Sequence, residues 1–121
     1  MSRDHTKLRF FPIADSLTLR VYRATEFLPA TERYGLQSQM RRAAVSVVTN
    51  VVEGACRRTD KAYSQFLEIA LGSASELEYH LLLSADLEYF LRSVYDELNR
   101  EVTGVKRMLS GLLNKLKADS R

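Results

Sequence analysis

The apolar residues between positions 91 and 116 recur at intervals that alternate strictly between four and three residues. The members of this series are Leu91, Tyr95, Leu98, Val102, Val105, Leu109, Leu112 and Leu116. Such spacing places every member on one stripe of an α-helix, which is the pattern of coiled-coil-like packing. We therefore expect a helix over about residues 86–116, on the order of 45 Å long. A continuous apolar stripe of this length predicts a bundle, in which other helices cover the stripe.

Three further helical patterns precede this one. We expect a first helix over about 13–26, a second over about 36–58, and a third from an N-cap at Thr59 or Asp60 to about Ala85. The first is expected to bury Ile13, Leu17, Val21, Ala24 and Leu28. The second is expected to bury Leu36, Met40, Ala43, Val47, Asn50, Val51 and Gly54. For the third, the expected inward residues are Phe66, Ile69, Ala70, Ser73, Leu77 and Leu81.

The composition also favours an all-α protein. Glycine occurs five times and proline twice, and no long segment alternates in the manner of a strand. Short connections between the helical patterns imply antiparallel neighbours, so the predicted fold is an all-α, antiparallel up-down-up-down four-helix bundle. We expect a single domain over residues 1–121, with frayed ends at 1–10 and 117–121.

Two features bear on the cellular compartment. The sequence contains no apolar run long enough to cross a bilayer, and its first residues lack the apolar segment of a secretion signal. We therefore expect a cytoplasmic protein of bacterial type with no membrane partner. Cys56 is the single cysteine, so no intrachain disulfide is possible. Its basic neighbours alone do not make a reactive thiol, and we interpret it as an ordinary helical residue.

The charges are segregated along the chain. The net charge is +3, but residues 33–61 carry +4, residues 62–101 carry −6 and residues 102–121 carry +4. Segregation on this scale suggests either a basic surface for phosphates or complementary faces that join subunits. The candidate nucleic-acid-binding residues are Arg41, Arg42, Arg57, Arg58 and Lys61. A solvated helix face is the alternative interpretation, and cations near a helix C-terminus also complement its dipole.

Polar and very small residues interrupt the apolar faces of the second and third helices. These residues are Asn50, Glu53, Gly54, Gly72, Ser73 and Glu76. In an antiparallel pair they lie at matching heights, which predicts one hydrogen-bonded cluster with close backbone approach at the glycines. The cluster either fixes helix register or forms an acid/base pair of carboxylates, and no nucleophile or phosphate loop accompanies it. Glu76 and His80 lack the spacing of a di-iron site, so we expect no metal, no cofactor and no enzymatic activity.

The same region carries a specific resemblance. The residues concerned are Tyr34-Gly35-Leu36, Ser38-Gln39-Met40-Arg41-Arg42-Ala43-Ala44, Ser46, Asn50, Glu53-Gly54, Arg58, Phe66-Leu67, Ile69-Ala70, Gly72-Ser73 and Glu76-Leu77. With these residues the chain resembles the four-helix-bundle proteins of intervening sequences in bacterial large-subunit (23S) ribosomal RNA genes. Relatives of that group are accessory variability determinants of diversity-generating retroelements. The chain departs from the family at Val48, where proline is frequent, and at Leu71, where a basic residue is frequent.

The resemblance implies a homopentamer whose charges are multiplied fivefold. It leaves two functional classes open. One is a non-enzymatic, oligomeric adaptor that binds RNA or DNA electrostatically through basic helix faces, with a reverse transcriptase as a further possible partner. The other is a homo-oligomeric scaffold for protein–protein interaction that binds no nucleic acid.

Overall fold

The computed structural model describes residues 3–119, with side chains from residue 9 onward. Its elements are helix α1 (Arg3–Thr25), a 3₁₀ turn η1 (Ala30–Glu32), a π-helical turn η2 (Arg33–Gln37), and helices α2 (Ser38–Ala55), α3 (Asp60–Asp86) and α4 (Arg92–Asp119). No strand occurs among the described residues. The predicted all-α, four-helix fold is therefore confirmed.

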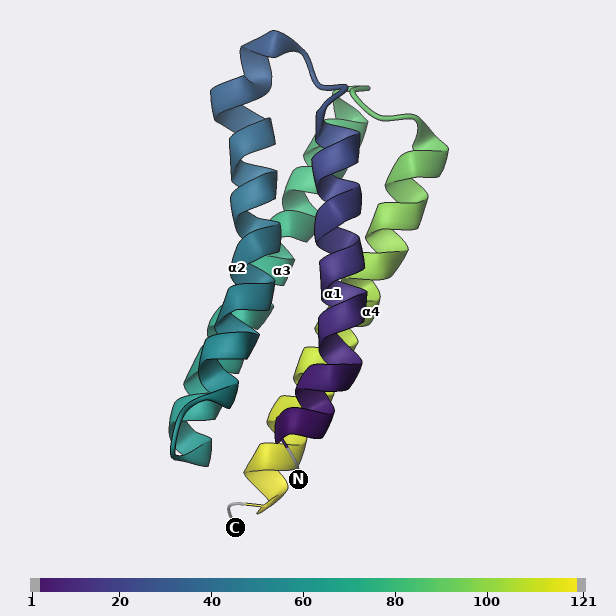
Figure 1. Cartoon of the computed structure of the whole chain (residues 1–121). Helices are drawn as coiled ribbons and strands as arrows, with labels where there is room; N and C mark the ends of the chain where they lie inside the picture. Colours follow the sequence, from purple (N-terminus) through teal and green to yellow (C-terminus); the bar gives the residue numbers. More distant parts are fainter. Residues whose placement is uncertain (1–2, 120–121) are drawn as a thin grey trace.

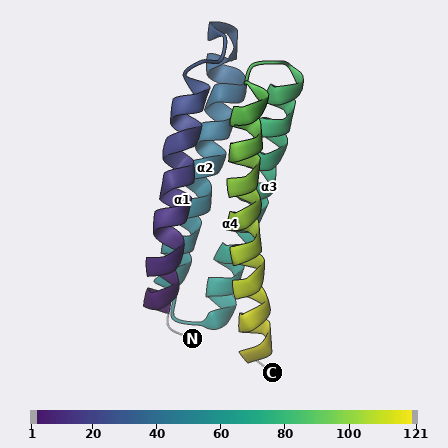
Figure 2. The ribbon, with the colours of Figure 1, turned by 90° about the vertical axis from the view of Figure 1, so that its right-hand side faces the viewer.

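The four helices lie side by side as a bundle. Consecutive helices run in opposite directions, and the α2–α3 connection lies at the same end as the start of α1 and the end of α4 (Figures 1 and 2). Helix α2 packs between α1 and α3, and α4 packs against α3 and α1. The α1–α2 and α3–α4 connections therefore meet at the opposite end of the bundle.

The apolar stripe of α4 follows the predicted seam over most of its length. Its buried members are Tyr95, Leu98, Val102, Val105, Leu109, Leu113 and Leu116. Leu113 replaces the predicted Leu112, because a straight helix has 3.6 residues per turn and drifts away from a strict 3.5-residue repeat. Leu91 is 75% exposed and lies before the helix, so its inclusion was wrong.

The core face of α3 agrees with the prediction at Ala70, Leu77 and Leu81 and differs from it elsewhere. Its buried residues are Tyr63, Leu67, Ala70, Ala74, Leu77, Leu81 and Ser84, which themselves alternate by four and three. Phe66 and Ser73 are half-buried, and Ile69 is 52% exposed. Apolar residues occur on both sides of the true stripe, so hydrophobicity alone did not fix the rotation of this helix. Small core residues, Ala74 and Ser84, weaken the signal of the correct stripe.

The start of α1 and the end of α4 extend beyond the predicted bounds, whereas α2 (Ser38–Ala55) is shorter than the predicted 36–58. Frayed ends were expected at 1–10 and 117–121, and the structure has α1 begin at Arg3 and α4 continue to Asp119. Residues 1–2 and 120–121 lie outside the described residues. Pro12 lies inside α1, where it lacks the N–H that an interior position donates. Buried Phe10 and Ala14 anchor the helix on either side of it. Ile13, predicted inward, is instead exposed.

The connections are set by local hydrogen bonds. Thr59 Oγ1 accepts a hydrogen bond from the backbone N–H of Ala62 at 3.1 Å, which confirms Thr59 as the N-cap of α3. Helix α3 ends with Glu88 in the left-handed region (φ 63°) and a bond from Tyr89 N–H to the Ser84 carbonyl at 2.9 Å. This is a Schellman motif, and it explains why α4 begins at Arg92 and not near Asp86.

Candidate nucleic-acid interface

The Arg41 side chain forms hydrogen bonds with the C-terminal end of α1. Its Nε donates to Thr25 Oγ1 at 2.9 Å, its Nη2 donates to the Tyr22 carbonyl at 3.1 Å, and its guanidinium lies 4.7 Å from the centroid of the Tyr22 ring. Gln37 Nε2 also donates to the Thr25 carbonyl at 3.1 Å. The last carbonyls of a helix have no partner within the helix, and side chains from η2 and α2 satisfy them here. Arg41 thus holds α1 and α2 together.

Arg42 and Arg33 have different surroundings from Arg41. Both side chains are exposed, and Arg42 donates from Nη2 to Gln39 Oε1 at 3.1 Å. Within residues 9–119, neither arginine forms an ion pair with a carboxylate. Their charges are therefore directed to solvent and remain available to an anion.

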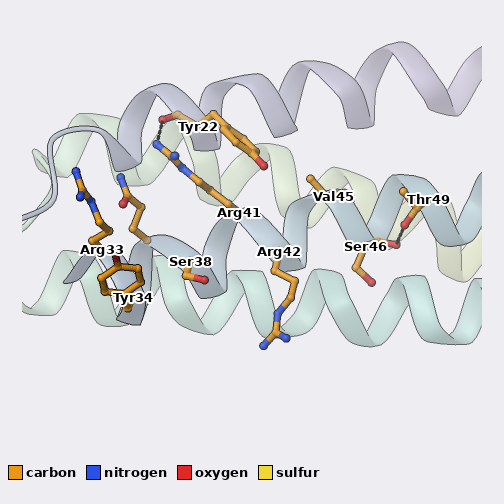
Figure 3. A pocket seen from close by; sticks show the side chains of 10 residues that line it. Tyr22, Arg33, Tyr34, Ser38, Arg41, Arg42, Val45, Ser46 and Thr49 are labelled. Atoms are coloured by element: carbon orange, nitrogen blue, oxygen red, sulfur yellow. Dashed lines mark hydrogen bonds between the residues drawn. The ribbon is translucent and has the colours of Figure 1, made fainter. Parts of the chain in front are cut away.

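An open groove with a volume of about 710 Å³ brings these residues together. It lies over the end of α1, turn η2 and the first half of α2 (Figure 3). The lining residues are Tyr22, Arg33, Tyr34, Gln37, Ser38, Arg41, Arg42, Val45, Ser46 and Thr49. No carboxylate occurs among these lining residues, whereas three arginines and three aliphatic hydroxyls do. This donor-rich composition suits a phosphate-bearing ligand.

The second predicted basic cluster lies at the opposite end of the bundle. Arg57, Arg58 and Lys61 flank the α2–α3 connection, and all three side chains are exposed. Arg57 Nη2 lies 4.0 Å from Glu53 Oε2, and its guanidinium lies 4.7 Å from the Phe66 ring centroid. At 1.5 Å per residue, the length of α2 separates Arg41 from Arg57 by roughly 24 Å. One chain therefore presents two separate basic surfaces.

The predicted polar cluster forms in part. Ser46 Oγ and Ser73 Oγ are hydrogen-bonded at 2.8 Å, and Asn50 Nδ2 donates to the Ser46 carbonyl at 2.8 Å and to its Oγ at 3.0 Å. Ser46 therefore joins Asn50 to Ser73 across the α2–α3 contact. At Gly54, an added Cβ would lie 2.8 Å from the Phe66 Cβ, so the predicted close approach of the helices exists there.

The other members of that cluster are not brought together. Glu53 and Glu76 are exposed, and the hydrogen bonds of the cluster include neither carboxylate. A Cβ added at Gly72 would meet nothing within 4 Å, so no close approach requires glycine there. Their inclusion was wrong because these three residues lie on the outward faces of α2 and α3, beside the contact and not within it.

Residues 6–111 match the sequence model of the family described as 23S rRNA-intervening sequence protein. The chain belongs to this family. A crystal structure of a protein of unknown function from the S23 ribosomal protein family of Bacteroides thetaiotaomicron is similar, with a TM-score of 0.81 and 23% sequence identity over 94% of this chain and 99% of that one. This likeness supports the fold alone. Among curated proteins, none matches the chain.

The residues that carry the family resemblance overlap the groove. Tyr34, Ser38, Arg41, Arg42 and Ser46 belong to both sets. Sequence reasoning missed Arg33, Gln37 and Tyr22. Arg33 lies between the helices expected over 13–26 and 36–58, and Tyr22 and Gln37 carry no charge. In the sequence, the positive charge of Arg33 next to Tyr34 was the one signal that could have indicated this part of the groove.

Among the described residues, no group of three or more histidine, cysteine, aspartate or glutamate side chains lies close enough to hold a metal ion. Likewise, within the described part of the chain, no helix combines the length and the apolar character needed to cross a membrane.

Proposed function

We propose that the protein is a non-enzymatic, oligomeric adaptor that binds RNA or DNA electrostatically. The observation that carries this proposal is the groove at the α1–α2 end, which has three arginines and no carboxylate among its described lining residues. Electrostatic contacts to the phosphate backbone supply most of the affinity of proteins that bind without strong sequence preference. The sequence pI of about 9.2 agrees with such a role.

Two further considerations support the proposal. Membership of a family described by a ribosomal RNA intervening sequence favours RNA as the nucleic acid. Assembly as a homopentamer in the cytoplasm would repeat the groove and the separate Arg57, Arg58 and Lys61 surface five times. A reverse transcriptase is a further proposed partner, because an adaptor of this kind can hold an enzyme and its template together.

The test is size-exclusion chromatography with light scattering, combined with RNA-binding titrations at about 50 mM and about 200 mM salt. We expect an oligomer that binds a structured RNA at low salt and releases it at high salt. Arg42→Ala should weaken binding to all sequences and lower the salt dependence by about one unit of slope. Arg100→Ala removes an exposed arginine of α4 outside the groove and is the matched control. Salt-independent binding, or none, would contradict the proposal.

A second candidate function rests on a different surface. At the end where the α1–α2 and α3–α4 connections meet, an apolar pocket of about 310 Å³ is lined by Ala24, Phe27, Tyr89, Phe90, Leu91 and Val94. Phe27 is 81% exposed, and exposed apolar surface of this kind is typical of protein contacts. A protein scaffold without nucleic-acid binding is therefore the alternative. It predicts that Phe27→Ser and Leu91→Ser reduce the oligomer mass while RNA binding is negligible throughout.

A further inference from the structure

Tyr34 is an exposed aromatic residue on a fixed turn. Its side chain is 88% exposed although it belongs to η2, whose position is set by Glu32. The Glu32 carboxylate accepts a hydrogen bond from Leu36 N–H at 3.3 Å and another from Tyr89 Oη–H at 3.1 Å. The turn is thereby attached to the α3–α4 connection. The Tyr34 ring is consequently exposed to solvent, while hydrogen bonds of Glu32 hold the backbone of its turn in place.

The ring lies beside the cationic part of the groove. Figure 3 shows Tyr34 next to Arg33, with Ser38 and then Arg42 following along α2, and with Tyr34 and Arg42 on the same side of that helix. The other tyrosine of the groove is Tyr22, and the Arg41 guanidinium lies over its ring at 4.7 Å from the centroid. Tyr34 is therefore the ring that an incoming planar group can cover.

An exposed ring in one groove with two solvent-directed arginines matches the chemistry of an unstacked nucleotide. Aromatic side chains stack on the faces of bases, and arginines hold the flanking phosphates. In a duplex the base faces are covered by neighbouring base pairs, so a stacking residue favours single strands. An acidic peptide would use the arginines but gain little from the ring.

We infer that the groove binds single-stranded nucleic acid, with one base stacked on Tyr34 and the adjacent phosphates held by Arg33 and Arg42. This inference rests on the proposed function and specifies its ligand. From Ser38 to Thr49 the groove follows about three turns of α2, roughly 16 Å, which accommodates a few nucleotides of one strand.

The absence of tryptophan from the sequence permits a direct optical test. In Tyr34→Trp, the introduced indole is the single indole of the chain. Single-stranded RNA of mixed sequence should quench its fluorescence, whereas inorganic polyphosphate, which has phosphates but no bases, should not. The matched control is Tyr79→Trp, since Tyr79 is 59% exposed on α3 outside the groove. Equal quenching by polyphosphate, or equal quenching at position 79, would overturn the assignment of Tyr34 as a stacking residue.

Affinity measurements give the second test. Tyr34→Ala should weaken binding of single-stranded RNA by roughly 5- to 150-fold, the range found when one base–aromatic stack is removed. Tyr34→Phe keeps the ring and should retain the affinity. An oligonucleotide with abasic sites has no base to stack and should bind wild-type protein and Tyr34→Ala equally. Circular dichroism checks that each variant is folded.

The outcomes separate this inference from the proposed function. Salt-sensitive RNA binding that Tyr34→Ala leaves unchanged would overturn the stacking role and leave the adaptor function standing. If Tyr34→Ala changes the oligomer mass but not the RNA affinity, the ring belongs to a protein interface and the inference is overturned. Failure of wild-type protein to bind any nucleic acid at low salt would overturn both, whereas capture of an acidic peptide alone would identify a different ligand.

Discussion

Arg41 and Arg42 carry the same charge and adjoin one another in the sequence, but they occupy different environments. Arg41 bonds to the buried Thr25 and to the Tyr22 carbonyl, whereas Arg42 is exposed and contacts Gln39. Hydrogen bonds from a charged donor to groups at a helix end contribute more than neutral surface contacts. The first arginine is therefore expected to stabilise the fold, and the second to remain free for a ligand.

This difference gives a prediction for the free energy of unfolding. Arg41→Ala should lower it by about 1–2 kcal/mol, because the Thr25 and Tyr22 acceptors lose a charged donor that is itself partly solvated. Arg42→Ala is the matched control and should change it by less than about 0.5 kcal/mol. Urea titrations followed by circular dichroism measure both. Equal stabilities of the two variants would show that the contacts of Arg41 contribute nothing to the fold.

At the scale of secondary-structure elements, the α2–α3 contact depends on one glycine and not on the other. An added Cβ at Gly54 would meet the Phe66 Cβ at 2.8 Å and the Tyr63 Cδ1 at 3.0 Å, whereas one at Gly72 would meet nothing within 4 Å. Gly54→Ala should therefore force the helices apart and cost about 1–3 kcal/mol of unfolding free energy. Gly72→Ala should instead stabilise α3 by up to about 1 kcal/mol. Thermal unfolding distinguishes the two, and destabilisation by both would mean that Gly72 is covered in the assembled protein.

The sequence predicted the existence of the four elements better than their rotation. In α4, large apolar residues on one stripe and charged residues elsewhere made the buried face evident, apart from Leu91 and the exchange of Leu112 for Leu113. In α3, Ala74 and Ser84 are buried while Ile69 is exposed, so hydrophobicity did not distinguish neighbouring stripes. The N-cap of α3 was predicted correctly because the Thr59 hydroxyl bonds to a backbone N–H only three residues away, at Ala62.

The candidate site was predicted less completely, for a related reason. Its exposed arginine Arg42 was found from charge alone, but a pattern of charges does not show which cation has a partner. The role of Arg41 depends on the Thr25 hydroxyl and the Tyr22 carbonyl of α1, which the fold brings to it. Arg33 and Tyr34 belong to a π-helical turn that no periodicity predicted.

At the scale of the whole molecule, the α1–α4 contact contains a group of charges that includes a partly buried carboxylate. Arg20 forms an ion pair with Glu97 and lies 3.0 Å from Glu101 Oε1. The other oxygen of Glu101 is buried without a hydrogen-bond partner. Burial raises the pKa of Glu101 above its ordinary value of 4.5, and the Arg20 charge opposes that rise. We therefore expect the stability of the α1–α4 contact to depend on pH.

The sign of this response follows from proton linkage. A carboxyl group whose pKa is raised by folding binds more protons in the native state than in the unfolded state, so its contribution to stability falls as pH rises. The loss should begin near the ordinary pKa of 4.5 and be complete above the raised folded value. Glu101→Gln removes the titration and keeps the shape of the side chain. The stability of wild type minus that of this variant should thus decrease as the pH rises from the ordinary pKa of 4.5 through the raised folded pKa, as measured by urea unfolding.

A second substitution tests the cause of the effect. Arg20→Gln removes the cation that holds the pKa of Glu101 down, so the same decrease should move to higher pH. The comparison is again made with and without Glu101→Gln, which cancels the titration of carboxylates that do not interact with Glu101. A difference that stays constant with pH would show that Glu101 is solvated in the native protein. A difference that grows with pH would show that Arg20 outweighs burial and that the ion pair, not desolvation, governs the α1–α4 contact.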